Sequence, residues 1–396
     1  MARRLRCPVE LSESQRLVRD NIREICEEFD DEYWRRNDRE ERYPTEFVDL
    51  LGEHGWLGIL LPEAYGGAGM NTPEVVVMME EIAANGGGFA TAQAIHGGIY
   101  NSVPIVKYAD EDLKEDLLPD VAAGETSIQA FGLTEPNAGS DSTSIETFAE
   151  REGDEYVVNG QKIWTSKAQE ADVVMLLTRT SLREESDQLG GMTLFFTEFD
   201  ADMDRVDVSE IPKAGRGASD SNEVWFDDFR IPAEDRIGEE GDGFKYLLEF
   251  ANSERISIAA NAVGVGQAAV EKATDYAADR VVFDAPIGSY QAVQHPLADS
   301  WAKLEMDELM IRKAAWLYDN DRDCGAEANA VKLRASEDSI EACERAVRAH
   351  GGMGYAKEYD VERYWRETMV NVIAPISNEM AKNYIGQHVL DLPKSY

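Results

Sequence analysis

The chain has 396 residues, 43% of them hydrophobic, and is long enough for two or three packed domains. Its 77 acidic residues outnumber the 39 basic ones, the formal net charge is −38, and the acids are spread along the whole chain. This balance argues against nucleic-acid binding, because no basic stripe survives it. No apolar run reaches the roughly 18 residues that a membrane-spanning helix needs.

An even spread of acids is typical of a solvated surface adapted to high salt, where charge repulsion is screened over about 3 Å at 1 M. We therefore expect a halophilic source. Residues 1–15 are basic but no apolar segment of signal-peptide type follows them, so a cytoplasmic protein is expected. The four cysteines are not at metal-ligand spacing with the five histidines, so we expect no metal site and reduced, mostly buried thiols at Cys7, Cys26, Cys324 and Cys343.

Residues 1–125 are expected to form an all-α domain. Apolar residues recur at helical spacing in 13–29, with Ser12 as a plausible N-cap, and residues 73–84 and 110–124 behave similarly. Residues 126–238 are expected to form a small β-domain. There, EYVVNGQKIWTS (155–166) predicts two strands joined at an Asn-Gly turn, and further strands follow in 171–180, 191–199 and 222–232.

Residues 239–396 predict a second all-α domain of the four-helix-bundle kind. One helix of about 35 residues is expected after Gly243, and two more over 291–319 and 326–350. The fold class is therefore α+β multidomain, with a β-barrel or sandwich between two helical halves.

Four separated motifs carry a family resemblance. GLTEPNAGSD (132–141) followed by NGQKIWTS (159–166) resembles the flavin-binding signature of the acyl-CoA dehydrogenase family. DRVVFDAPIGSYQAVQ (279–294) and HGGMGYAKEYDVER (350–363) resemble that family's two C-terminal signatures. The order of helices, strands and helices is similar as well, and the resemblance covers nearly the whole chain.

The resemblance implies an FAD enzyme. A flavin needs a flat slot and hydrogen bonds along its polar edge, which Trp164 and the neighbouring hydroxyls could supply. Near the start of the β-domain, it assigns FAD contacts to Phe131, Gly132, Leu133, Thr134, Ser140, Trp164, Thr165 and Ser166. In the C-terminal half, it assigns them to Arg280, Phe283, Gln291, Arg348, Gly351, Gly352, Ser377 and Glu379. Arg280 and Gln291 resemble residues that reach the FAD of a neighbouring subunit. The family usually has Gln where this chain has Arg348. Two interpretations of Arg348 stay open: a cation on the helix surface, or an additional contact to a phosphate of FAD.

The family's reaction needs a carboxylate base within reach of the α-proton of a thioester. Many members carry this Glu near the C-terminus, where this chain has Pro375. A second branch, with isovaleryl- and long-chain-type enzymes, places it on the long helix after the β-domain, and here that position is Glu254. Glu254 lies seven residues after Leu247 and four before Ile258, on an apolar helical face where a carboxylate is costly unless it is paired or functional.

By resemblance, the protein is expected to oxidise an acyl-CoA to the trans-2-enoyl-CoA, in fatty-acid or branched-chain amino-acid catabolism, and to pass electrons to an electron-transfer flavoprotein. The acyl-CoA would contact Ser140, Asn252, Ser253, Arg255 and Ala374, and a homotetramer is expected. Two alternatives stay open: an acyl-CoA oxidase or flavin monooxygenase on the same fold, and a non-catalytic scaffold.

Overall fold

The computed structural model describes residues 10–394. In the N-terminal part, Ser12 caps the first helix through a capping box with Gln15, as the sequence predicts. A single π-turn, η3 (Ala83–Gly87), joins the two most deeply buried helices of this part, and Arg363 steadies it by donating to Gly86 O at 2.8 Å. The helices are α1 (Glu13–Glu27), α2 (Asp31–Glu40), α3 (Thr45–Glu53), α4 (Thr72–Ile82), α5 (Gly88–Tyr108) and α6 (Glu111–Ala123).

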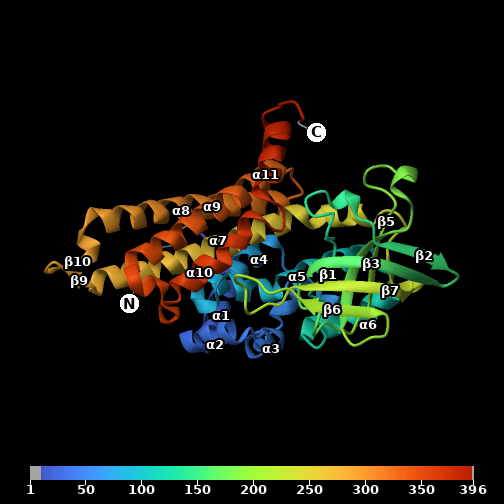
Figure 1. Cartoon of the computed structure of the whole chain (residues 1–396), viewed down its shortest axis with the longest axis horizontal. Coiled ribbons are helices and arrows are strands. Elements are labelled where there is room, and N and C mark those ends of the chain that lie inside the picture. The colour runs from blue at the N-terminus through green and yellow to red at the C-terminus, as the bar shows by residue number, and fades with distance from the viewer. Residues whose placement is uncertain (1–9, 395–396) are drawn as a thin grey trace.

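The middle part is one eight-stranded sheet (Figure 1). Its strand order is β6-β7-β3-β2-β4-β5-β8, with β1 pairing parallel to β4 off this path, and aromatic side chains such as Tyr156 and Phe195 fill its core. The strands are β1 (Ala130–Gly132), β2 (Phe148–Glu152), β3 (Glu155–Thr165), β4 (Val173–Arg179), β5 (Met192–Glu198), β6 (Val206–Glu210), β7 (Asn222–Pro232) and β8 (Arg236–Ile237).

The hairpin predicted at Asn159-Gly160 is wrong. Strand β3 runs without a break through this dipeptide, and its pairing with β7 shifts register there, as at a β-bulge. Gly160 takes φ +147, and the Asn159 amide exchanges two hydrogen bonds with Asp228 of β7. The actual β2–β3 turn lies at Gly153, with φ +71. Asn-Gly therefore serves here as a bulge and not as a turn.

The C-terminal part is a bundle around α7 (Gly243–Asp279), α8 (Gln291–Asp319) and α9 (Gly325–His350), which confirms the three long helices predicted from sequence. Helix α7 also packs on α4 and α5, so it joins the two helical halves. A two-stranded ribbon, β9 (Val281–Val282) with β10 (Ala285–Pro286), projects beyond the far end of α7 (Figure 1). Two short helices follow, α10 (Val361–Thr368) and α11 (Asn378–Tyr384).

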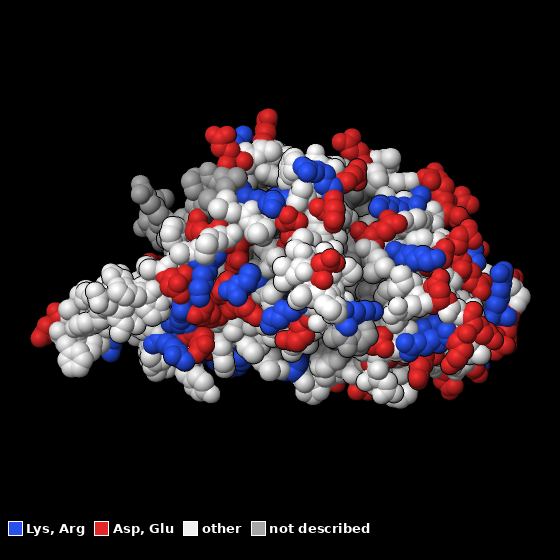
Figure 2. All heavy atoms as spheres, turned by 90° about the horizontal axis from the view of Figure 1, so that it is seen from above, with Lys and Arg blue, Asp and Glu red and all other residues white. Residues whose placement is uncertain are grey.

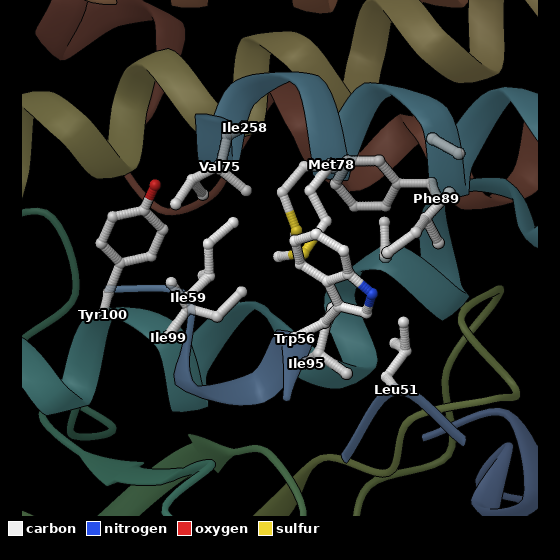
Figure 3. Close-up of a cluster of buried hydrophobic side chains, with 14 of the residues drawn as sticks. Leu51, Trp56, Ile59, Val75, Met78, Phe89, Ile95, Ile99, Tyr100 and Ile258 are labelled. Carbon is white, nitrogen blue, oxygen red and sulfur yellow. The ribbon is translucent and has the colours of Figure 1, made fainter. Parts of the chain in front are cut away.

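The main apolar core lies where α4, α5 and α7 meet. Figure 3 shows Val75 and Met78 of α4, Ile95 and Ile99 of α5 and Ile258 of α7 converging on one cluster, and these five residues are buried. Acidic side chains are scattered over the surface seen in Figure 2, whereas the tapered end with β9 and β10 carries few charges on this face. Cys26, Cys324 and Cys343 are buried, as expected, and Cys7 lies outside the described residues. Within residues 10–394, no helix is long and apolar enough to cross a membrane.

Candidate active site

The loop after β1 is organised by a buried carboxylate. Glu135 accepts from the backbone N–H groups of Glu146 at 2.6 Å and Thr147 at 3.0 Å, and it pairs with Lys162 of β3 at 2.7 Å. Lys162 Nζ also donates to Leu133 O at 3.1 Å. Burial opposes the charge on Glu135, but Lys162 and the backbone donors outweigh it and hold the pKa of Glu135 below its ordinary value. This ion pair therefore fixes the loop against β3.

The loop and the end of β3 present their polar and aromatic groups side by side. Thr134 O accepts from the N–H of Ile163 at 2.9 Å, which places Thr134 next to Trp164. Trp164 has φ +68, and 53% of its surface is exposed. The hydroxyl Oγ1 of Thr165 is buried and has no hydrogen-bond partner among residues 10–394. A flat ring and an unpaired buried hydroxyl thus adjoin the loop, while Ser140 lies exposed further along it.

Glu254 lies on α7 with its side chain 27% exposed. Arg255 turns to its own helix and donates to Asn252 Oδ1 at 2.8 Å, and the Ser253 hydroxyl donates to Phe250 O at 2.8 Å. Burial lowers the pKa of Arg255, against an attraction to Glu254. The carboxylate itself faces α5, where His96 Nε2 lies 3.6 Å from Glu254 Oε1. The carboxylate is thus partly exposed, and His96 is the basic group that lies within 4 Å of it among the described residues.

The C-terminal segment 374–379 is tied to α9 by a buried lysine. Lys332 Nζ donates to Ile376 O, and to Asn378 Oδ1 at 2.9 Å. Burial lowers the pKa of Lys332 to about 8. Ser377 caps α11 by accepting from the N–H of Met380 at 3.3 Å. Lys332 also interacts with Arg255 and Glu379, so this segment lies close to the Glu254 end of α7.

Three family models match the chain in order. They are the acyl-CoA dehydrogenase N-terminal domain over residues 12–125, the middle domain over 130–229 and the C-terminal domain over 241–390. The chain is also 35% identical over 383 residues to a probable acyl-CoA dehydrogenase of Bacillus subtilis, a match that covers 96% of this chain and 99% of that relative. The chain belongs to the acyl-CoA dehydrogenase family. This confirms the resemblance and the fold class expected from sequence.

Solved structures of similar shape include two with instructive chemistry. Butyryl-CoA dehydrogenase from Megasphaera elsdenii is 28% identical with a TM-score of 0.90, and the match covers 97% of this chain and 100% of that one. The prolyl acyl carrier protein oxidase AnaB is 25% identical with a TM-score of 0.88, over 96% of this chain and 99% of that one. As a member of the acyl-CoA dehydrogenase family, this protein is an FAD-dependent oxidoreductase.

The β-domain residues fit a flavin. The exposed ring of Trp164 can cover one face of an isoalloxazine, and the unpaired Thr165 hydroxyl can meet its polar edge. Gly132 permits the close packing behind them, because a Cβ there would lie 2.7 Å from Leu176 Cδ1.

Arg280, Phe283 and Gln291, to which the resemblance also assigns FAD contacts, lie in another part of the chain. Arg280 follows Glu254 by 26 residues, which is about 39 Å along a helix at 1.5 Å per residue. Arg280, Phe283 and Gln291 are exposed at the far end of α7, and Phe283 is 89% exposed. They therefore do not join Trp164 or Glu254 within one chain.

Gly351 and Gly352 are also exposed, and a Cβ built on either would meet nothing within 4 Å. Arg348 pairs with Glu344 on its own helix and lines a cavity of about 600 Å³. That cavity touches neither Glu254 nor Trp164, and its Arg366 is already paired with Glu362 at 2.6 Å and Asp38 at 2.8 Å. The pairing of Arg348 with Glu344 favours the interpretation of Arg348 as a surface cation and not as a phosphate contact. Glu379 is exposed as well, 3.8 Å from Lys382.

Sequence reasoning missed Glu135, Lys162, His96 and Lys332. Glu135 and Lys162 lie within the first two motifs, GLTEPNAGSD and NGQKIWTS. A charged residue in a loop or strand is usually solvated, so the sequence gives no sign that these two are buried. Their burial is evident only in the folded structure. His96 and Lys332 stand at helical positions among apolar residues, and nothing in the spacing distinguishes them from core or surface residues.

Proposed function

We propose that Glu254 is the base that removes the α-proton of an acyl-CoA thioester in this enzyme, giving the trans-2-enoyl-CoA. The observation that carries the proposal is the position of Glu254 on α7, partly exposed and without a hydrogen-bonded cation of its own, together with Pro375 at the alternative position. FAD, when bound, supplies the acceptor for the β-hydride.

The segment 374–378 supplies the second part of the proposal. Pro375 has no N–H, and the N–H of Ala374 already donates to Val370 O at 2.9 Å. The next donor is the N–H of Ile376, which has no acceptor among the described residues, and Lys332 fixes this peptide through Ile376 O. Ile376 is therefore the backbone group best placed to polarise the thioester oxygen.

The far end of α7 supports an assembly of several copies. Arg280, Phe283 and Gln291 lie exposed at the far end of α7, so we assign them, together with the exposed Gly351 and Gly352, to the FAD of another subunit. Exposed apolar residues continue along α8 from this end, and a second copy would cover them: Trp301, Met306, Leu309 and Trp316. A homotetramer with shared FAD sites is our proposal.

The remaining parts of the proposal rest on family resemblance and composition. They are an electron-transfer flavoprotein as acceptor, a branched or long acyl chain, and a cytoplasmic, halophilic origin. The alternative acceptor is oxygen, which the similarity to an acyl carrier protein oxidase favours.

The test is anaerobic stopped-flow mixing of the yellow protein with acyl-CoA esters of different length and branching. Loss of flavin absorbance identifies the substrate, and slow recovery of that absorbance in air supports a dehydrogenase. Rapid recovery in air would favour the oxidase, and no loss with any ester would refute the proposed reaction.

A further inference from the structure

His96 is a buried polar residue that lies beside Glu254 and has no part in the proposed machinery. His96 sits on α5 with 7% of its side chain exposed, and neither ring nitrogen has a hydrogen-bond partner in residues 10–394. A buried imidazole without a partner is costly. Its Nε2 lies 3.6 Å from Glu254 Oε1, so the carboxylate is the polar group that it faces.

The surroundings restrict how this imidazole can turn. The ring of His96 packs against Tyr100 with a centroid distance of 5.0 Å, and Tyr100 stacks in turn on Phe250 of α7 at 6.4 Å. The Tyr100 hydroxyl is directed toward α7 (Figure 3) and donates to Ser253 O at 3.3 Å. One aromatic contact, between Tyr100 and Phe250, and one hydrogen bond thus hold α5 and α7 together beside Glu254 and His96.

The ionisable groups around Glu254 lie on both α5 and α7. Tyr100 and His96 approach it from α5, and Arg255 interacts with it from the next position on α7. Burial raises the pKa of Tyr100, and the Glu254 carboxylate raises it further, so Tyr100 stays neutral. Arg255 is hydrogen-bonded to Asn252. Among the described residues, His96 is the basic group that comes within 4 Å of the carboxylate, whereas Arg255 makes no ion pair with Glu254 at that distance.

We infer that His96 is a positioning residue for Glu254. An N–H at Nε2, which lies 3.6 Å from Oε1, would attract that oxygen and leave Oε2 to face the α-carbon of a bound substrate. This inference rests on the proposed role of Glu254.

The test measures α-proton removal without hydride transfer. An acyl-CoA whose β-methylene is replaced by sulfur can lose its α-proton but cannot deliver a hydride, so enzyme-catalysed deuterium uptake from D₂O reports the base alone. Mass spectrometry of the recovered ester gives the exchange rate, and the same samples give FAD content and ester affinity.

Three variants separate the outcomes. His96→Leu removes the N–H at similar volume and should slow exchange about 10- to 100-fold, as expected for a misdirected reacting group, with FAD content and ester affinity retained. His96→Gln restores a donor and should recover most of the rate. Ser102→Ala, which removes another buried polar group of α5 whose hydroxyl donates to Ile99 O, should exchange like the wild type.

An unchanged exchange rate in His96→Leu overturns the inference. Glu254→Gln tests the underlying proposal separately: if it still exchanges, the proposed base is wrong, whereas exchange that is lost there but intact in His96→Leu refutes only the role of His96. Should His96→Leu fail to fold, His96→Phe decides. This variant keeps an aromatic ring against Tyr100 but has no N–H, and exchange at the wild-type rate there would overturn the inference.

Discussion

The two ends of helix α7 differ in how much of a site one chain can build. Around Glu254, side chains of α5 and α7 meet, Lys332 of α9 interacts with the adjacent Arg255, and the carboxylate is only partly exposed. Around Arg280, the chain makes a small ribbon with Val281 and Phe283 exposed to solvent. In our proposal, the same helix carries a base that acts within its own chain and a cofactor contact that serves a neighbouring subunit. A substitution at one end of α7 therefore tests whether the other end depends on it.

The largest effect is expected at the Glu254 end of α7. Glu254→Gln is nearly isosteric and removes the basic oxygen, so flavin reduction by substrate should fall by at least about 10² to 10⁴-fold, while the fold, the yellow colour and the oligomer persist. Stopped-flow bleaching of the flavin measures the rate. Asp275→Asn, an exposed acid of the same helix, is the control and should react like the wild type. A Glu254→Gln rate within about tenfold of the wild type would place the base elsewhere.

At the exposed end, Arg280→Ala should weaken FAD retention and loosen the assembly. A charged hydrogen bond is worth about 1.5 to 3 kcal/mol, so the FAD dissociation constant should rise roughly 10- to 100-fold. A cofactor bound across subunits stabilises their association, so added FAD should restore the oligomer. Size-exclusion chromatography with and without FAD is the measurement, with the exposed Arg183→Ala of the β-domain as control. Full flavin content and an unchanged oligomer would contradict a shared site.

The helical bundle between the two ends of α7 contains a buried carboxyl group, that of Asp307, whose charged form is disfavoured by its surroundings. Burial, with the neighbouring Asp338, raises the pKa of Asp307 from its ordinary 3.8 to about 8, and Asp307 Oδ2 lacks a partner among residues 10–394. Because the folded state keeps a proton that the unfolded state loses, stability should fall as the pH rises from about 4 to 8.

Asp307→Asn should remove this loss. Above pH 8, the variant should be more stable than the wild type by about 1 to 3 kcal/mol, the usual range for an unsatisfied buried polar group. Near pH 4 the difference should vanish. Thermal unfolding of both proteins across this range is the measurement, and parallel curves at all pH values would refute the assignment.

The smallest effect concerns the charged surface, which the two ends share. With a net charge of −38, repulsion should fall as salt shortens the screening length from about 10 Å at 0.1 M to 3 Å at 1 M. The midpoint of thermal unfolding should therefore rise with salt, by roughly 2 to 4 °C for each 1 kcal/mol gained. KCl and NaCl should act equally, because screening does not depend on the cation. A midpoint that falls as salt is added would argue against adaptation to salt.

The sequence by itself determined the family, the order of helices and strands, the three long helices and the flavin motifs. These depend on local periodicity and on residues close together in the chain, such as the capping box at Ser12. Through the resemblance to one branch of the family, it also singled out Glu254, which lies on an apolar helical face. The Asn-Gly dipeptide misled, since the same two residues suit a turn or a bulge and pairing with β7 selects the bulge.

Only the tertiary structure decided which groups meet. His96 and Glu254 are 158 positions apart in the chain, and Lys332 reaches Ile376 across 44. The tertiary structure also separated Arg280, Phe283 and Gln291 from Trp164, although all four residues belong to motifs that predict FAD contacts. Spacing along a chain fixes which face of an element a residue occupies, but contacts between distant elements follow from how the helices and the sheet bury their apolar faces together.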